Sequence, residues 1–293
     1  MASLKEIRTR ISSVKTTRQV TSAMKMVSAA KLKKAQDAIL QIRPYADGLH
    51  SVLNSISSGM DDQDDSVYCK QRQPNKVLII LISSNRGLCG AFNTNIAKTA
   101  FELAIKKYNR QLSLGDVRFM VIGKQGEKYL KSKKMTIDRE ANEIFDHLDY
   151  DSAAKLADDV MRDYAIQKYD RIELVYNQFK NAAVHFCSSE QFLPVEMEPE
   201  TDHKKANLNY IFEPSLERVV EDLIPRSLKI QFFKALLDSN AAEHGARMTA
   251  MHKATDNATD LIKDLTLTFN KARQAAITNE ILEVTNGAEA LNG

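Results

Sequence analysis

The chain of 293 residues has no tryptophan, and its three cysteines (Cys69, Cys89 and Cys187) form no CxxC pair. This pattern excludes a disulfide framework and a four-cysteine zinc site, and it fits a reducing compartment. The longest clean apolar run, residues 77–82, is far shorter than the roughly 20 residues that span a bilayer. The start of the chain lacks the apolar segment of a secretory signal. Aromatic residues make up only 7%, which favours an elongated protein over a compact enzyme.

The net charge of +3 is unevenly distributed. Residues 1–43 carry ten Lys and Arg against two acidic residues, whereas residues 226–293 carry eight of each sign. A basic first segment predicts a partner with negative charge, which could be nucleic acid, anionic lipid or an acidic protein surface. A solvated helix face is the simpler alternative.

Helix-breaking residues are scarce at both ends of the chain. Between residues 4 and 58 the breakers are Pro44 and Gly48, and between residues 226 and 286 there is Gly245. These spans predict two helices of about 80–90 Å at about 1.5 Å per residue. A helix of that length needs a partner along its side, because intrinsic propensity alone does not stabilise it.

The apolar periodicity predicts that partner. On the last segment a 3-4 spacing selects Leu237, Ala241, His244, Met248, Met251, Thr255, Ala258, Ile262, Leu265, Phe269, Ala272 and Ala276. On the first segment the apolar positions are Leu4, Ile7, Ile11 and Val14, then after a skip Val20, Met24 and Val27, then Leu32, Ala35, Ile39 and Ile42. The skip predicts a local change of supercoil. Both stripes are buried most simply by an antiparallel coiled coil, with the middle of the chain inserted at one end. Two unrelated helices on a globular core are the alternative.

The middle of the chain has the pattern of an α/β sheet. Strands are predicted at 76–83, 117–122, 171–177 and 182–186, and helices at 93–108, 125–133 and 152–167. Alternation of strands and helices with a final hairpin predicts a mostly parallel sheet with helices packed against it. The polar segments 63–73 and 194–209 are predicted linkers.

No catalytic motif is evident in the sequence. Gly87 and Gly90 lie between a strand and a helix, as a phosphate loop would, but the spacing is G-x-x-G, so a purely structural turn is favoured. Cys89 lies before a helix, where a thiolate is favoured, but no partner has the spacing of an activating base, so a buried structural thiol is preferred. His244 and His252 are eight residues apart, two helical turns rather than the one turn of a helical metal pair, and His244 is better explained as a packed or partner-facing residue.

Four motifs together resemble the gamma subunit of F-type ATP synthases from end to end. They are Lys5-Glu6-Ile7-Arg8 through Thr21-x-Ala23-Met24-x-Met26-Val27-x-Ala29, Arg86-Gly87-Leu88-Cys89-Gly90 with Asn93, Ala246-Arg247-Met248 through Asn257-Ala258, and Asn270-Lys271-Ala272-Arg273-Gln274-Ala275-Ala276-Ile277-Thr278-x-Glu280 closing with Gly287-Ala288.

The resemblance implies an antiparallel coiled coil of long terminal helices with an inserted Rossmann-like α/β domain. On this basis we expect a first coiled-coil helix at 1–58, linkers at 59–75 and 196–214, a central α/β domain at 76–195 and a second coiled-coil helix at 215–293. It also implies a central-stalk rotor that couples proton flow through a membrane ring to ATP synthesis or hydrolysis in the beta subunits. The chain itself would have no active site, cofactor, metal or direct nucleotide site. It would be a peripheral protein on the cytoplasmic side of the cell membrane. Because no transit peptide precedes Met1, we expect a bacterial-type chain or else a mature organellar form.

The resemblance further implies the partners and the contact residues. The partners are the ring of three alpha and three beta subunits, the epsilon subunit and the c-subunit ring, and not nucleic acid. The contact residues implied for the beta subunits are Met24, Lys25, Arg247, Arg273, Gln274, Thr278 and Glu280. The apolar residues Ile277, Ile281, Leu282 and Val284 would form a tip held in a sleeve at the top of the alpha–beta ring, which the sequence expects to extend about 10 Å beyond the first helix.

Two features depart from the family pattern, and two other functions remain open. The three cysteines offer no close pair for thiol regulation, and the acidic run 61–65 and the segment 196–205 match no family motif, so both are expected to be solvated loops. The alternatives are a nucleic-acid-binding helical adaptor, motivated by the basic first segment, and a small-molecule-binding α/β protein with helical arms.

Overall fold

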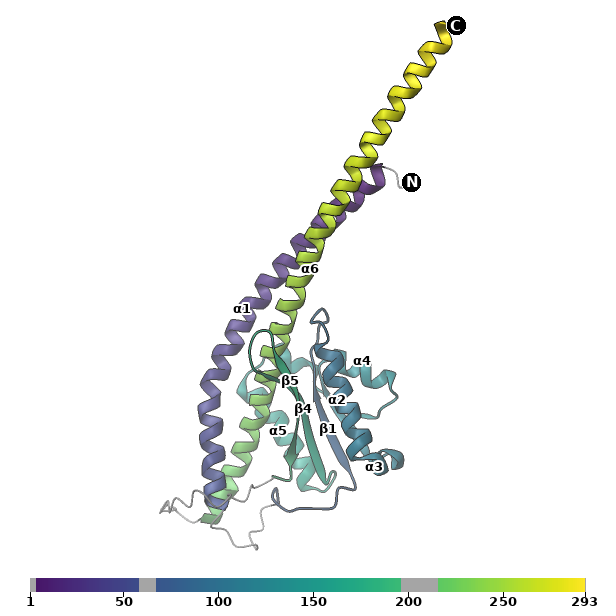
Figure 1. Ribbon diagram of the computed structural model, residues 1–293. Helices are drawn as coiled ribbons and strands as arrows, with labels where there is room; N and C mark the ends of the chain where they lie inside the picture. Colours follow the sequence, from purple (N-terminus) through teal and green to yellow (C-terminus); the bar gives the residue numbers. More distant parts are fainter. Residues whose placement is uncertain (1–3, 58–66, 196–215, 293) are drawn as a thin grey trace. The chain divides into compact units, whose positions relative to one another are not determined.

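The computed structural model describes residues 4–57, 67–195 and 216–292, which form two compact units. The first unit combines residues 4–28 with 248–292, and the second comprises the described residues between 29 and 247. Two helices, α1 (Leu4–Ser57) and α6 (Leu216–Asn292), contribute to both units (Figure 1). The linker predicted at 196–214 lies outside the described residues, as do residues 59–66 of the linker predicted at 59–75 and both predicted solvated loops. No helix in the described ranges has an apolar stretch long enough to cross a membrane.

In the first unit, α1 and α6 form a two-helix coiled coil and run in opposite directions (Figure 1). The hydroxyls of Thr21 and Thr255 meet across it at 2.9 Å. The less exposed positions of α1 include Leu4, Ile7, Ile11, Val14, Arg18 and Thr21, which follow an unbroken 3-4 spacing, and then Ser22, Met24, Lys25 and Ser28. Those of α6 include Met248, Met251, Thr255, Ala258, Ile262, Leu265, Phe269 and Ala272. Counting outward from the threonine pair brings Leu4 opposite Ala272, so one continuous seam, named here the heptad seam, joins the two helices.

The predicted skip in the first helix is wrong. Val20 and Val27 are 53% and 57% exposed, and polar residues take the seam positions instead. Polar side chains fit there because they form hydrogen bonds: Ser28 donates to the carbonyl of Met24 at 2.8 Å, and Thr255 donates to that of Met251 at 2.8 Å. On α6 the predicted positions are confirmed from Leu237 to Ala272. Ala276 is exposed because α1, which runs in the opposite direction, begins at Leu4 opposite Ala272.

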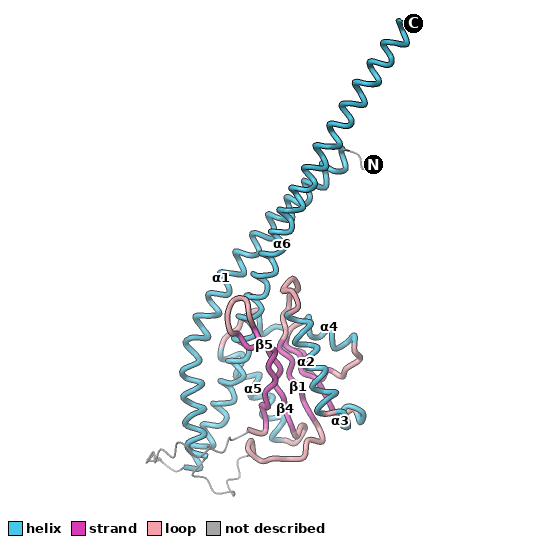
Figure 2. The backbone as a smooth tube through the Cα atoms, in the orientation of Figure 1, coloured by secondary structure: helices cyan, strands magenta, loops and turns pink. Residues whose placement is uncertain are grey.

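The second unit is built on a five-stranded sheet of order β3-β2-β1-β4-β5. Its strands are β1 (Val77–Ile82), β2 (Val117–Ile122), β3 (Ile137–Glu140), β4 (Arg171–Phe179) and β5 (His185–Leu193). Pairs β1–β2, β1–β4 and β2–β3 are parallel, and β4–β5 is the expected antiparallel hairpin (Figure 2). The hairpin turn lies later than predicted, because β4 continues to Phe179 and β5 begins at His185. Strand β3 was not predicted from the sequence.

Helices cover both faces of this sheet (Figure 1). They are α2 (Phe92–Lys107), α3 (Asn109–Leu114), α4 (Lys124–Ser132) and α5 (Tyr150–Ala165), with a short 3-10 turn, η1 (Asn142–Phe145). The side chains of β1 alternate between two cores, which explains its continuous apolar sequence. One face packs with α2, α3 and α4, and the other packs with α5, the first turns of α6 and the end of α1.

Within the second unit α1 is also bound to α6 and the sheet by polar contacts. The guanidinium of Arg43 donates to the buried carboxylate of Asp238 at 3.3 Å and to the carbonyl of Phe179 at 3.0 Å. Burial raises the pKa of Asp238, and the charge of Arg43 opposes that rise. One arginine therefore joins α1, α6 and β4.

Candidate functional site

The turn between β1 and α2 is the first part of the candidate site. The left-handed residues in it are Leu88 (φ 63°) and Gly90 (φ 60°), whereas Gly87 has no left-handed φ. Gly90 therefore serves the structural role predicted for it, since glycine adopts this conformation without steric cost. At Gly87 the predicted reason is wrong, because the following residue takes the left-handed conformation. Leu88 is 65% exposed, so its side chain points away from the core.

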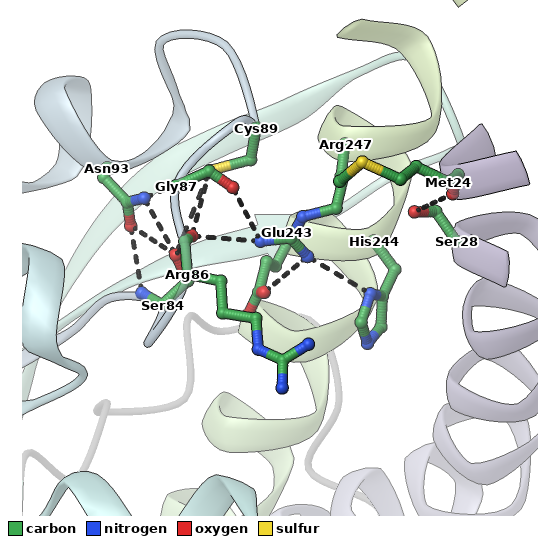
Figure 3. Close-up of polar contacts among 10 residues, drawn as sticks. All are labelled: Met24, Ser28, Ser84, Arg86, Gly87, Cys89, Asn93, Glu243, His244 and Arg247. Carbon is green, nitrogen blue, oxygen red and sulfur yellow. Dashed lines mark hydrogen bonds and ion pairs between the residues drawn. The ribbon is translucent and has the colours of Figure 1, made fainter. Parts of the chain in front are cut away.

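The turn is bracketed by a hydrogen-bonded group of side chains at the start of α2 (Figure 3). The amide of Asn93 donates to the hydroxyl of Ser84 at 2.8 Å and to the sulfur of Cys89 at 3.0 Å. The amide oxygen of Asn93 accepts from the backbone N–H of Ser84 at 2.9 Å. The hydroxyl of Ser84 also lies 2.7 Å from the carbonyl of Arg86 and donates to it. Both ends of the turn are thus joined through one asparagine.

Cys89 is a buried thiol within this group. Burial raises its pKa, and the nearby charge of Arg247 only partly opposes that rise. An activated cysteine nucleophile requires the opposite shift, toward the thiolate. The prediction of a structural thiol is confirmed.

Arg247 holds the turn from α6. Its side chain is buried, and it donates to the carbonyl of Arg86 at 3.0 Å and to that of Gly87 at 3.3 Å (Figure 3). Its other terminal nitrogen donates to the carboxylate of Glu243 at 2.6 Å, one helical turn earlier. Burial raises the pKa of Glu243, and the charge of Arg247 opposes that rise. The turn and α6 are therefore joined by a charge-assisted set of hydrogen bonds.

His244 lies beside Arg247 and is kept neutral. Burial lowers its pKa to about 4, with smaller contributions from the charges of Arg247 and Lys31. Its Nδ1 lies 3.5 Å from the guanidinium of Arg247. The prediction that His244 is packed on the seam is confirmed by its partial burial.

The same stretch of α6 fills the place where doubly wound sheets bind ligands. In the order β3-β2-β1-β4-β5 the connections diverge at β1 and β4, and ligands of such sheets lie outside the carboxyl ends of those strands. Here Gly245 of α6 lies against the turn after β4, so closely that an added Cβ would be 2.8 Å from the carbonyl oxygen of Ala182. Arg247 occupies the turn after β1. Carbonyl oxygens there face a cation, whereas a phosphate loop presents N–H groups to an anion. The geometry favours the structural interpretation of this turn.

Met24 and Lys25 lie on α1 in the first unit, and both are partly buried. The sequence pattern placed Met24 on the seam, and its partial burial agrees with that prediction, whereas the partial burial of Lys25 was not predicted. Their proposed contact with a partner is therefore limited to the parts of the two side chains that stay exposed.

The end of α6 is the third part of the candidate site. Every side chain described between residues 273 and 288 is exposed, including Arg273, Gln274, Thr278 and Glu280. Four large apolar side chains of the predicted tip are exposed as well: Ile277 by 48%, Ile281 by 59%, Leu282 by 53% and Val284 by 68%. The helix runs from Ala272, the last layer of the heptad seam, to Asn292, which is about 30 Å at about 1.5 Å per residue. The predicted overhang of about 10 Å is too short, because the actual seam pairs Leu4 with Ala272.

Two features of the site were missed by sequence reasoning. Glu243 precedes Arg247 by four residues, a spacing that predicts a helical ion pair and could have identified it. The sequence offered only a weak indication of the exposed, left-handed Leu88, namely a single leucine in a turn that also contains Gly87 and Gly90.

Comparison with known proteins decides the family. The family model described as "ATP synthase" matches residues 3–291. A protein of Christiangramia forsetii named "ATP synthase gamma chain" is 54% identical over 293 residues, covering 100% of both chains. The chain belongs to the ATP synthase gamma-chain family. A gamma chain of Cytophaga hutchinsonii is 49% identical over 294 residues and also covers 100% of both chains.

Solved structures agree with this family. A chain of the Tetrahymena thermophila mitochondrial ATP synthase, from a structure titled central stalk and c-ring, is 25% identical with a TM-score of 0.58, covering 80% of this chain and 99% of that one. A chain of the Euglena gracilis enzyme is 20% identical with a TM-score of 0.68, covering 98% and 94%, and shows the fold. The predicted fold class, two long terminal helices in an antiparallel coiled coil with an inserted Rossmann-like α/β domain, is confirmed. The resemblance to the gamma subunit is confirmed as well, and with it the place of the chain in the central stalk of an F-type ATP synthase.

Proposed function

We propose that this gamma chain is a rotor without an active site of its own, which couples a membrane ring of c subunits to ATP synthesis or hydrolysis in beta subunits. Its partners are the ring of three alpha and three beta subunits, the epsilon subunit and the c ring, and it lies on the cytoplasmic side of the membrane. The proposal rests on its gamma-chain relatives and on the similar Tetrahymena thermophila chain, which belongs to a structure of a central stalk and c-ring.

The observation that carries the proposal is the uncovered end of α6. About 30 Å of helix extends beyond the last layer of the heptad seam, with four large apolar side chains exposed on it. A lone helix with an exposed apolar surface gains stability only when another molecule covers it. A sleeve formed by the alpha–beta ring would supply that cover. Such an apolar contact has few directional bonds, so it offers little resistance to turning.

Polar contacts that transmit torque are proposed just before this tip, at Arg273, Gln274, Thr278 and Glu280. These side chains are exposed and available to a partner. The hydroxyl of Thr278 donates to the carbonyl of Gln274 at 2.9 Å, so Thr278 offers a partner mainly its remaining acceptor capacity. Gln274 keeps both donor and acceptor capacity, and it is therefore the better candidate for a hydrogen bond that forms and breaks during each step.

Reconstitution tests the proposal. Mixing the chain with alpha and beta subunits should yield a stoichiometric complex with ATPase activity, whereas the chain alone should neither hydrolyse ATP nor retard a DNA probe. The paired variant Ile281→Gln and Val284→Gln should weaken assembly. Leu114→Gln is the matched control, because Leu114 is 67% exposed on α3 and is not part of the tip. Normal assembly of the paired variant, or equal loss in the control, would contradict the sleeve.

Two further variants separate the proposed apolar bearing from the proposed polar torque contacts. Removing Glu289–Gly293 should weaken assembly modestly and leave turnover nearly intact. Thr278→Val should spare assembly and reduce turnover, although by less than a change at Gln274. If the truncation abolishes turnover and the point variant has no effect, the division between bearing and torque contact is wrong.

A further inference from the structure

Leu88 has an unusual combination of conformation and exposure. Its φ of 63° lies in the left-handed region, which is costly for a residue without a short polar side chain. Its side chain is nevertheless 65% exposed, so burial of apolar surface does not offset that cost. A strained residue persists only where its surroundings fix the backbone around it.

The surroundings of Leu88 fix the backbone from two sides. On one side, Asn93 bridges Ser84 and Cys89 and so closes the base of the turn. On the other side, the guanidinium of Arg247 binds the carbonyls of the two residues that precede Leu88. Glu243 holds that guanidinium in place from the same helix.

The burial of Arg247 bears on its expected role. The family resemblance implies a contact between this position and a beta subunit, but the side chain is only 9% exposed and its terminal nitrogens are already bound. A partner carboxylate would have to displace Glu243 or the turn. Arg86 and Leu88, by contrast, are exposed at the surface of the turn.

We propose that Arg247 is a positioning residue, which acts on the rotor's partner through the turn and not by touching the partner itself. Held by Glu243, its guanidinium fixes the carbonyls of Arg86 and Gly87, and this displays Leu88 at the surface of a turn that also carries the exposed Arg86. The matching surface is an apolar pocket with carboxylates at its rim, on a subunit of the ring that surrounds the rotor. The identity of that subunit rests on the proposed function, whereas the fixing of the turn does not.

Cys89 reports on the turn in the isolated full-length chain. Its side chain is buried in the turn, so a thiol reagent reaches it only when the turn opens. In a chain with Cys69→Ser and Cys187→Ser, labelling should be slow, and Arg247→Ala should accelerate it about tenfold or more because three charge-assisted hydrogen bonds are lost. Loss of the positive charge would raise the thiol pKa further and slow labelling, so acceleration cannot arise from the charge change.

Further variants keep this test falsifiable. Arg247→Lys retains the charge but not the planar fork, and it should accelerate labelling by an intermediate factor. Lys253→Ala removes an exposed cation from the same helix and is the matched control, which should label like the parent. Circular dichroism identifies any variant that fails to fold. Labelling of Arg247→Ala and Arg247→Lys within about twofold of the parent would overturn the proposal.

The assembled complex tests the second half of the proposal. Leu88→Asn keeps the left-handed conformation, which asparagine tolerates, but removes the apolar contact. It should reduce ATPase activity without accelerating labelling of Cys89. If Arg247 acts through Leu88, the double variant with Arg247→Ala should lose no more activity than the more impaired single variant. Additive losses would show an independent contact of Arg247 with the partner and would overturn the proposal. Failure to assemble at all would contradict the proposed function and leave the labelling result to decide the role of Arg247.

Discussion

Val14→Asp should open the coiled coil of the first unit, whereas Val20→Asp should leave it closed. Val14 is partly buried on the heptad seam, and Val20 is 53% exposed on the other side of α1. Loss of a partly buried valine costs about 1 kcal/mol, less than the loss of a fully buried one. Placing a carboxylate in the partly dry seam adds about 1–3 kcal/mol. The difference in helix propensity between valine and aspartate is the same at both positions and cancels in the comparison.

The total for Val14→Asp is about 2–4 kcal/mol, which corresponds to an increase of about 30-fold to 1,000-fold in the opening equilibrium. Amide hydrogen exchange in peptides from residues 4–28 measures this opening directly, because exchange requires the helix to open. Val20→Asp should change exchange by less than about threefold. Equal acceleration of exchange in both variants would contradict the heptad seam and support the seam predicted from the apolar pattern, which includes Val20. No acceleration in either variant would refute the coiled coil.

Four further outcomes are expected. Met24→Lys should leave the complex assembled and hydrolysing ATP while lowering proton pumping per ATP, and equal loss of both activities would indicate misfolding. Gln274→Leu should spare assembly and reduce the rate of ATP hydrolysis by about 2-fold to 10-fold, because the loss of one hydrogen bond raises the barrier by about 0.5–1.5 kcal/mol. Because the pKa of His244 is lowered to about 4, the unfolded chain binds a proton first as pH falls. Stability should be complete above about pH 6.5 and decline toward pH 4 by at most about 3 kcal/mol, and urea titrations of His244→Gln should lack that decline. Gly245→Val should destabilise the second unit by about 1–3 kcal/mol through its clash with the turn after β4, and an unchanged melting temperature would contradict that close approach.

The seam of α6 could be predicted from the sequence, and that of α1 only in part. From Leu237 to Ala272 the seam of α6 is mostly apolar or alanine, so the apolar pattern and the buried face coincide. On α1 the seam passes through Thr21 and Ser28, whose hydroxyls bind helix carbonyls, while Val20 and Val27 face solvent. A method that follows apolar residues selects the valines, because hydrogen bonds that make a polar seam tolerable are not visible in the periodicity.

The α/β unit shows a similar division. Strand β1 and strand β2 were predicted closely, since runs buried on both faces are continuous and apolar. Strand β3 was missed because Ile137–Glu140 carries three charged residues on an edge of the sheet. The contact between Arg247 and the turn joins residues 160 or more positions apart, and no local pattern encodes it. The family motifs include both Arg247 and the turn, but they do not show that Arg247 binds the turn.

The end of the heptad seam at Ala272 determines how α6 carries a sideways load. Up to that layer two helices resist bending together, and beyond it a single helix extends like a beam clamped at one end. At about 1.5 Å per residue, Arg273 and Gln274 lie within about 3 Å of the clamp, and Glu280 lies about 12 Å from it. A push at these residues acts on a short lever arm, so little of it is lost in flexing the helix. A push at Val284 or beyond would act on a longer arm and bend the helix more, which makes the far end suited to guiding the axis and the near end suited to bearing force.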